Sequence, residues 1–209
     1  MERLNMTRHQ TAILDSKTRS DISIWQPMHR LRLAVRCLRQ GGVLAYPTEA
    51  VYGLGCDPWN GRAVARLLAI KRRSMTKGLI LIAADPDQLR PFVEPLEPER
   101  QREIHATWPG PNTWLLPARV ATPAWLTGRF DTLAVRVSAH PLVAELCRAY
   151  GGAIVSTSAN QAARPAARTA LGVRLALDEP PDYILAGHCA GSDRPSVIRD
   201  GRTGRLIRA

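Results

Sequence analysis

Three cationic side chains stand close together in the sequence, at Lys71, Arg73 and Lys77. Elsewhere the chain relies on arginine: of its 29 Lys and Arg residues only three are lysines, and two of these belong to this short segment. A lysine ammonium is a compact charge that suits a shared phosphate oxygen or a tightly held carboxylate. We therefore expect the segment to contribute to an anion site, although two lysines can also fall together by chance.

Hydroxyl and amide side chains form a second candidate site, the segment STSAN at residues 156–160, directly after an apolar segment. Such side chains, together with exposed backbone N–H groups, can bind a phosphate, a ribose or an amino acid. An ordinary capped turn has the same composition, and on composition alone it is the more frequent explanation. The loop 47–58, which contains Thr48 and a Gly-x-Gly pattern, is open to the same two interpretations.

Arg136 lies in a segment of alternating residues, 133–138, in which Leu133, Val135 and Val137 share one face. This alternation is typical of a half-buried strand. It places Arg136 on the face opposite the valines, so that the guanidinium is aimed away from the core. We therefore expect Arg136 to have a specific partner.

Several common catalytic patterns are absent from the sequence. No G-x-x-x-x-G-K-[ST] and no G-x-S-x-G occur, which excludes a P-loop and a hydrolase nucleophile elbow. The four cysteines and the five histidines are scattered without the spacing of metal ligands. We expect neither a protein-held metal nor a disulfide framework, as is typical of a reducing cytoplasm.

Helical and strand patterns alternate along the chain. Periodicity predicts helices over 27–40, 60–73, 85–93, 97–107 and 140–151, and strands over 43–46, 79–83, 133–138, 153–155, 196–199 and 205–208. Asn60 suits the N-cap of the second helix, and the last two strands form a hairpin. Strands that alternate with helices favour an α/β fold with a mixed sheet. A loop that leaves a strand end is a good place for a ligand.

The composition is that of a basic, folded chain. The 209 residues are 45% hydrophobic, which is enough for the core of one domain or a tightly joined pair. The net charge of +11 predicts attraction to polyanions such as RNA and nucleotides. Nine basic and two acidic residues lie between residues 30 and 73, and six of those arginines fit solvated helix faces.

The sequence predicts a soluble protein. Its longest apolar run, at residues 79–84, is far shorter than the roughly 20 residues of a membrane span, so we expect no membrane partner. Residues 1–24 have no signal-peptide pattern. We interpret them as a flexible N-terminal extension that precedes a domain over 25–209, or as a mis-assigned start, since Met28 could also begin the chain.

Several segments, taken in order, resemble the YrdC/TsaC family of threonylcarbamoyl-AMP synthases. These are GGVLAYPTEAVYGLGCDP (41–58), the K-x-R of 71–73 followed by KGL (77–79), WPGPNT (108–113), WLTGRFDTLAVRV (125–137), HPLV (140–143), STSAN (156–160) and PSVIRD (195–200). Long motifs in the right order are far more specific than any one of them. WLTGRFD and KGLILIA are similar to the short, single-domain bacterial form.

The resemblance implies both a fold and a reaction. The fold is an open, twisted, mixed α/β sheet flanked by helices around a large basic cavity, the YrdC-like fold. The reaction joins L-threonine, CO2 or bicarbonate, and ATP with Mg2+, and it yields L-threonylcarbamoyladenylate and pyrophosphate. The product serves the threonylcarbamoyladenosine modification of tRNA next to the anticodon, either directly or through a transfer complex. Such an enzyme is expected in the cytoplasm.

The resemblance also assigns roles to the matching residues. The family's K-x-R and S-x-N pairs, at the ATP and adenylate site, correspond to Lys71, Arg73, Ser158 and Asn160. Further nucleotide-side positions correspond to Thr132, Arg194, Ser196 and Arg208. Positions that hold L-threonine correspond to Thr48, Lys77, Arg136 and Ser156. Catalysis is expected from the charges of Lys71, Arg73 and Lys77 rather than from a covalent step.

Two departures from the family pattern occur, and one alternative function stays open. Gln161-Ala162-Ala163 replaces the family's x-S-G after S-A-N, and Ser74 replaces a proline after K-x-R. The alternative is a non-catalytic factor of the same fold that binds structured RNA in tRNA or ribosome maturation, which the net charge and the arginine-rich first helix would suit. Arg136 and the STSAN segment favour the synthase, because an RNA platform needs neither.

Overall fold

The computed structural model describes residues 28–161, 164–192 and 195–208. The predicted extension at residues 1–24 and the predicted nucleotide-side residue Arg194 lie outside these ranges. None of the helices within them is long and apolar enough to cross a membrane.

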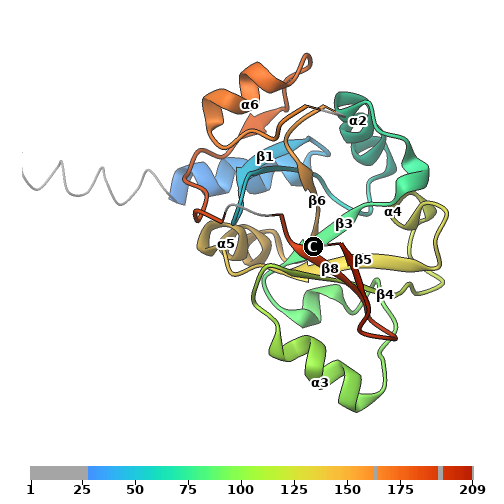
Figure 1. The fold of residues 1–209 in the computed structure, drawn as a ribbon. Helices are drawn as coiled ribbons and strands as arrows, with labels where there is room; N and C mark the ends of the chain where they lie inside the picture. The colour runs from blue at the N-terminus through green and yellow to red at the C-terminus, as the bar shows by residue number, and fades with distance from the viewer. Residues whose placement is uncertain (1–27, 162–163, 193–194, 209) are drawn as a thin grey trace, which may run out of the picture.

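In the described residues nine strands form one sheet, in the order β7-β1-β2-β6-β3-β5-β4-β8-β9. The strands are β1 (Leu44–Pro47), β2 (Tyr52–Gly55), β3 (Ile80–Ala83), β4 (Asn112–Pro117), β5 (Thr132–Val137), β6 (Ile154–Ser158), β7 (Tyr183–Ile184), β8 (Val197–Asp200) and β9 (Leu206–Arg208). The pairs β1/β7, β3/β5 and β4/β8 are parallel, and the other neighbours are antiparallel. The predicted mixed sheet and the predicted C-terminal hairpin are thus confirmed (Figure 1).

Helices flank this sheet. They are a first helix at residues 28–39, α2 (Gly61–Lys71), α3 (Pro98–Ala106), α4 (Ala124–Thr127), α5 (Pro141–Tyr150) and α6 (Ala170–Ala176), with 3-10 turns η1 (Met75–Lys77) and η2 (Pro86–Leu89). Asn60 caps α2 as predicted, because its Oδ1 accepts the backbone N–H groups of Arg62 and Ala63 at 3.1 Å each. Beyond the last residue of α2, Arg72 adopts the left-handed conformation, with φ of 49°, and turns the chain.

Strand β1 is buried on both faces of the sheet and contributes to two cores. Ala45 packs in one cluster with Leu67 of α2, whereas Leu44 packs in the other with Leu38 of the first helix and Leu146 of α5. Successive strand residues point to opposite faces, which explains the division. Figure 1 accordingly shows α2 and α5 on opposite sides of the sheet. The predicted helix-flanked α/β architecture is confirmed.

Two local predictions were wrong. The predicted loop 47–58 contains strand β2, antiparallel to β1. Gly55 fits this strand because a Cβ there would lie 2.4 Å from the backbone oxygen of Val155, so only glycine permits the close approach of β2 and β6. The predicted helix over 85–93 is reduced to the single turn η2, which ends just before Pro91 because proline has no N–H to continue a helix.

Candidate functional site

A cavity of about 380 Å³ lies over the part of the sheet that the helices leave uncovered. Ile82 of β3 and Ile154 of β6 belong to the core under α5. Two residues along the same strands, on the same face, Ile80 and Ser156 line the cavity instead. The cavity thus continues the face that α5 covers, and its floor is built from strand residues of fixed register.

The lining combines hydroxyl groups with charged side chains. Its hydroxyl residues are Thr48, Tyr52, Ser156, Thr157, Ser158 and Ser196, its arginines are Arg73, Arg136 and Arg208, and its one described acid is Glu49. Seven of the residues predicted from the sequence therefore meet in one place: Thr48, Arg73, Arg136, Ser156, Ser158, Ser196 and Arg208. Three guanidinium groups against one carboxylate leave a net positive charge, which favours anionic ligands.

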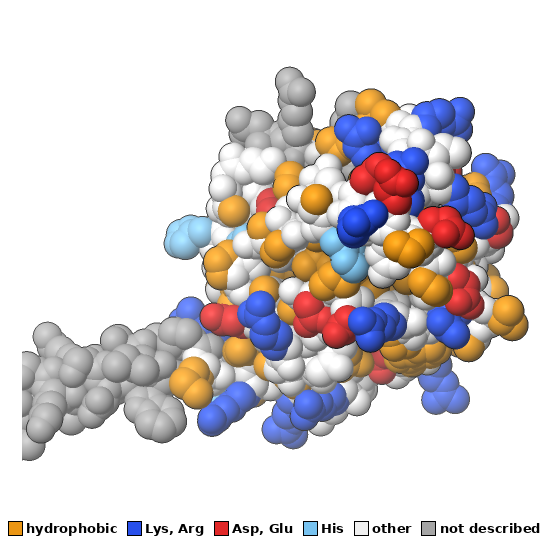
Figure 2. All heavy atoms as spheres, turned by 90° about the horizontal axis from the view of Figure 1, so that it is seen from below, with side chains coloured by type: hydrophobic (Ala, Val, Ile, Leu, Met, Phe, Trp, Pro, Cys, Tyr) orange, Lys and Arg blue, Asp and Glu red, His pale blue; other side chains and the backbone are white. Residues whose placement is uncertain are grey.

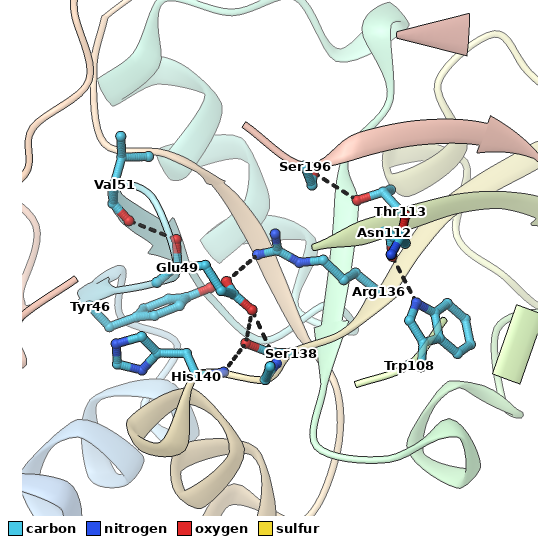
Figure 3. A network of polar contacts seen from close by, with 12 residues as sticks. Tyr46, Glu49, Val51, Trp108, Asn112, Thr113, Arg136, Ser138, His140 and Ser196 are labelled. Atoms are coloured by element: carbon cyan, nitrogen blue, oxygen red, sulfur yellow. Dashed lines mark hydrogen bonds and ion pairs between the residues drawn. The ribbon is translucent and has the colours of Figure 1, made fainter. Parts of the chain in front are cut away.

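Arg136 reaches from β5 to Glu49 across this cavity, with its Nη2 3.3 Å from Glu49 Oε2 (Figure 3). The strand alternation is as predicted, because Val135 and Val137 pack in the core while Arg136 lines the cavity on the opposite face. Both charged side chains are largely buried, at 11% and 10% exposure. The guanidinium is therefore held in a fixed place rather than solvated.

The carboxylate of Glu49 is held from its other side by the chain that follows β5. Its Oε1 accepts hydrogen bonds from Ser138 Oγ at 2.7 Å and from the backbone N–H of Ala139 at 3.1 Å (Figure 3). Burial raises the pKa of Glu49, but the charge of Arg136 and these hydrogen bonds outweigh it, so that the pKa lies below its ordinary value. Glu49 is therefore ionised at neutral pH.

The turn that carries Thr48 and Glu49 is fixed by its backbone and by a second segment. Thr48 Oγ1 donates to the backbone oxygen of Val51 at 2.7 Å. The backbone N–H groups of Ala190 and Ser192 donate to the carbonyl oxygens of Thr48 and Glu49, at 3.2 and 3.0 Å. Residues 190–192 thus hold this turn in place at the cavity.

The C-terminal hairpin supplies a further wall. Arg208 Nη2 donates to the backbone oxygen of Ser196 at 2.9 Å, and Thr113 Oγ1 lies 2.9 Å from Ser196 Oγ. Burial and the neighbouring charge of Arg136 lower the pKa of Arg208. The two guanidinium groups repel each other, so an anion bound between them would be stabilised by both.

Lys71, the last residue of α2, holds the STSAN segment. Its Nζ lies 2.5 Å from the backbone oxygen of Ser158, 2.8 Å from that of Asn160 and 3.4 Å from Asn160 Oδ1. An ammonium has three protons, so these contacts use all of them. Lys71 is 4% exposed, and burial together with the charge of Arg73 lowers its pKa to about 8. Lys71 therefore positions the segment and does not itself line the cavity.

Arg73 follows two residues later and does line the cavity. Its Nη2 donates to the backbone oxygen of Gly78 at 3.0 Å, which ties the guanidinium to the chain entering β3. Its Nε is buried and has no hydrogen-bond partner among the described residues. Residues 156–158, in turn, belong to strand β6 rather than to the capped turn that composition alone favoured.

Besides Lys71, three predicted residues within the described ranges do not reach the cavity lining. Lys77 is exposed in η1, so the structure does not bring it to the predicted threonine site. Thr132 shares the face of Arg136 but stands four residues away, at the start of β5. Asn160 contacts the site only through Ser158 and Lys71.

Glu49 is the site residue that sequence reasoning missed. Cations and hydroxyl groups are the side chains that bind anions, so an acid does not fit the pattern expected of an anion site. One signal was available: Glu49 is one of only two acids among the residues from 30 to 73, and it follows directly after Thr48. An isolated acid in a strongly basic segment is a candidate partner for a buried arginine.

The described residues offer no metal centre of their own. Their His, Cys, Asp and Glu side chains form no group of three that could hold a metal ion. The one acid in the cavity lining, Glu49, already serves Arg136 and Ser138. A divalent cation at this site would need oxygen ligands from a bound substrate.

Comparison with known proteins gives a consistent match. The family model Sua5/YciO/YrdC, described as "Telomere recombination", matches residues 36–209. A threonylcarbamoyl-AMP synthase of Nitrosococcus oceani is 57% identical over 182 residues, which cover 87% of this chain and 98% of that protein. A threonylcarbamoyl-AMP synthase of Halorhodospira halophila is 55% identical over 86% of this chain and 94% of that protein.

A solved structure with a similar fold is known as well. The crystal structure of P. abyssi Sua5 complexed with L-threonine superposes with a TM-score of 0.76 and 31% identity. The match covers 81% of this chain and 50% of that one, so this chain spans about half the length of the P. abyssi protein.

Proposed function

This chain belongs to the Sua5/YciO/YrdC family, and we propose that it is a threonylcarbamoyl-AMP synthase. It is an enzyme that forms L-threonylcarbamoyladenylate and pyrophosphate from L-threonine, CO2 or bicarbonate, and ATP. The structural observation that carries the proposal is the single cavity in which Arg73, Arg136 and Arg208 lie among hydroxyl groups. A carboxylate, a carbamate and a triphosphate are all anionic, and fixed cations in one cavity can hold them together.

The reaction needs positioning more than covalent chemistry. The uncharged amine of threonine adds to CO2 and releases one proton, which gives a carbamate with one remaining N–H. A carbamate oxygen then attacks the α-phosphorus of ATP. The bond from that phosphorus to the oxygen that bridges it to the β-phosphorus breaks, and pyrophosphate leaves with the electron pair. Two anions must be aligned against their repulsion, and preorganised positive charge lowers this barrier. No side-chain nucleophile is required.

On the threonine side we assign Arg136, Thr48 and Ser156. The planar guanidinium of Arg136 can bind the threonine carboxylate with two hydrogen bonds. Thr48 and Ser156 are nearly buried, at 6% exposure each, and offer their hydroxyl oxygens to the polar groups of the amino acid. An analogue that lacks those groups would leave the hydroxyls unpaired, which gives selectivity.

On the nucleotide side we assign Arg73 and Arg208 to the phosphates, and Ser158 and Ser196 to the adenylate. Asn160 contributes through its contacts with Ser158 and Lys71. Lys71 contributes by holding the Ser158–Asn160 segment in place.

Three of the predicted residues receive no such assignment here. Lys77 and Thr132 lie outside the cavity lining, and we assign them no contact. Arg194, which lies outside the described residues, stays a prediction.

We propose that Mg2+ enters as part of the substrate, bound to the phosphates of ATP. The described residues hold no cluster of acids that would bind it alone. Mg2+ commonly keeps several waters and takes most of its other ligands from phosphates, so a site without acids suits it in this form.

The adenylate serves tRNA, and we propose that the chain acts in the cytoplasm. The carbamoyl group is destined for an adenosine next to the anticodon, so a tRNA-binding partner, or tRNA itself, must take over the product. The names of the relatives support the adenylate as the product to be passed on.

The alternative function, a non-catalytic RNA-binding factor, is not favoured. The match covers nearly the whole length of two relatives, and both are named as synthases. The face shown in Figure 2 is not a single basic platform, because acidic and basic side chains are interspersed on it. Several exposed arginines are paired, as Arg66 is with Glu179 and Arg202 with Asp131. Interspersed charges of both signs give only a weak attraction to phosphate backbones.

Pyrophosphate release tests the proposal. The protein is incubated with ATP, bicarbonate and Mg2+, with and without L-threonine. We expect release only when threonine is present. Release that is absent, or that does not depend on threonine, would rule out the synthase.

A further inference from the structure

Glu49 has an acceptor atom that the described residues leave without a hydrogen bond. Its Oε1 accepts two hydrogen bonds, from Ser138 and Ala139. Its Oε2 is buried and has no hydrogen-bond donor among the described residues, although Arg136 Nη2 lies 3.3 Å away as an ion-pair partner. A buried carboxylate oxygen without a hydrogen bond is costly and uncommon. Because Glu49 belongs to the cavity lining, a ligand in this cavity is the natural source of the donor.

The charges beside this atom suit one class of ligand. Glu49 and Arg136 place a negative and a positive group 3.3 Å apart, both of them at the same cavity. An α-amino acid carries an ammonium and a carboxylate on one carbon atom, so its two charges are also neighbours. The pair is therefore complementary to a zwitterion, with Arg136 facing the carboxylate and Glu49 facing the ammonium.

The geometry points to Glu49 as the residue that binds the α-amino group of the amino-acid substrate; this inference rests on the proposed function. We propose that Glu49 Oε2 accepts a hydrogen bond from that nitrogen, both in threonine and in the carbamate, which keeps one N–H. The ionised state of Glu49 is maintained by Arg136, Ser138 and Ala139, so that the acceptor is always available. Neighbouring backbone bonds hold it in place, since Ser192 N–H donates to the carbonyl oxygen of Glu49 at 3.0 Å.

The competing explanation is that Glu49 only orients Arg136. Binding of a ligand with an amine and of one without it distinguishes the two roles of Glu49. A residue that only orients Arg136 affects every ligand with a carboxylate, whereas a residue that binds the amine affects only ligands that have one.

The experiment measures binding of two ligands by titration calorimetry, to the full chain and to Glu49→Gln. The ligands are L-threonine and 3-hydroxybutanoate with the same configuration at the hydroxyl carbon. In 3-hydroxybutanoate a hydrogen replaces the ammonium on the carbon next to the carboxylate. Glutamine has the shape of glutamate without its charge. We expect Glu49→Gln to lower the affinity for L-threonine by more than about tenfold, because a charge-assisted hydrogen bond is lost. We expect the affinity of Glu49→Gln for 3-hydroxybutanoate to stay within about twofold of that of the unsubstituted chain, because this ligand has no ammonium for Glu49 to bind.

Three results would overturn the inference: an equal loss for both ligands, an unchanged affinity for threonine, or no binding of threonine to the unsubstituted chain. The last result would also contradict the proposed function, whereas the first two leave it standing. Thermal unfolding checks that Glu49→Gln folds. If it does not, Glu49→Asp replaces it, because it keeps the charge but shortens the reach; the same selective loss of threonine binding is expected.

Discussion

The ammonium nitrogen of Lys71 lies 2.5 Å from the backbone oxygen of Ser158, and it makes two further contacts with Asn160. The end of α2 and the end of β6 are thereby joined, although 87 residues separate them in the sequence. The two halves of the K-x-R and S-x-N pattern are thus bound directly to each other. Within this pattern Arg73 and Ser158 line the cavity, and Lys71 fixes where Ser158 stands.

Lys71→Met tests this positioning role. Methionine keeps an unbranched chain of similar length but removes three contacts of the ammonium, and the backbone oxygen of Asn160 loses its one donor among the described residues. We therefore expect a loss of about 2 kcal/mol in the free energy of unfolding. We also expect turnover to fall by more than about tenfold, because the Ser158–Asn160 segment is no longer held. Denaturant unfolding and pyrophosphate release measure the two effects. Wild-type turnover in a folded Lys71→Met protein would show that catalysis does not need Lys71 to position the Ser158–Asn160 segment.

The pKa of Lys71 predicts how ATP binding depends on pH. As the pH rises through about 8, the ammonium loses one of the three protons with which it holds Ser158 and Asn160, so we expect the KM for ATP to rise. Unfolding does not explain such a rise. The unfolded lysine has the ordinary value of 10.5, so between pH 8 and 10.5 the unfolded chain binds more protons and stability increases with pH. Initial rates from pH 7 to 9.5 measure KM, and a flat profile would contradict this role.

Arg136→Lys tests the recognition of the threonine carboxylate. Lysine keeps the charge but lacks the planar fork that binds a carboxylate with two hydrogen bonds. We expect the KM for threonine to rise by more than about tenfold, while the affinity for ATP changes by less than about twofold. Arg90→Lys, at an exposed arginine paired with Asp87, is the control and should change neither value. Equal losses for both substrates would show that Arg136 supports the whole cavity.

Glu49 contributes a part of the stability that is lost at acid pH. Its pKa in the folded chain lies below the ordinary value of 4.5, because Arg136 and its hydrogen bonds outweigh burial. The contribution is therefore fully present above pH 4.5, and it is lost as the pH falls through the folded value. We expect the difference in Tm between the unsubstituted chain and Glu49→Gln to be largest near pH 6 and to shrink below pH 4.5. A constant difference down to pH 3 would show that the charge of Glu49 is not what stabilises the fold.

Gly55→Ala tests the approach of β2 to β6. The added methyl group would lie 2.4 Å from the backbone oxygen of Val155, so we expect a loss of about 2 kcal/mol or more in the free energy of unfolding. Gly152→Ala is the matched control, because the nearest atom to its added methyl group is 4.0 Å away, on Tyr150. We expect that control to change stability by less than about 0.5 kcal/mol. Denaturant unfolding of both variants measures the difference, and equal stabilities would refute the close packing.

The sequence was most informative where a local rule determines the structure. The cap at Asn60 and the alternation around Arg136 were predictable because each depends only on neighbouring residues. Strand β2 was not, because Gly53 and Gly55 favour a loop by composition, and only the approach of β6 explains the glycine at position 55. Tertiary packing overrode local propensity there.

The site divides in the same way. Arg136 and the S-x-N segment were found from their types and their place after strands. Glu49 was missed because its meaning depends on Arg136, which is 87 positions away in the sequence and adjacent in the fold. Lys71 was assigned to the nucleotide itself, because spacing cannot show that its ammonium is already bound by carbonyl oxygens.

The most direct test of the central claim is detection of the adenylate itself. The protein is incubated with ATP, L-threonine, Mg2+ and carbon-13-labelled bicarbonate, and the quenched reaction is examined by mass spectrometry. We predict a species with the mass of threonylcarbamoyladenylate that carries one labelled carbon and disappears when threonine is omitted. A reaction in which ATP is consumed without such a species, or in which the species lacks the label, would contradict the account.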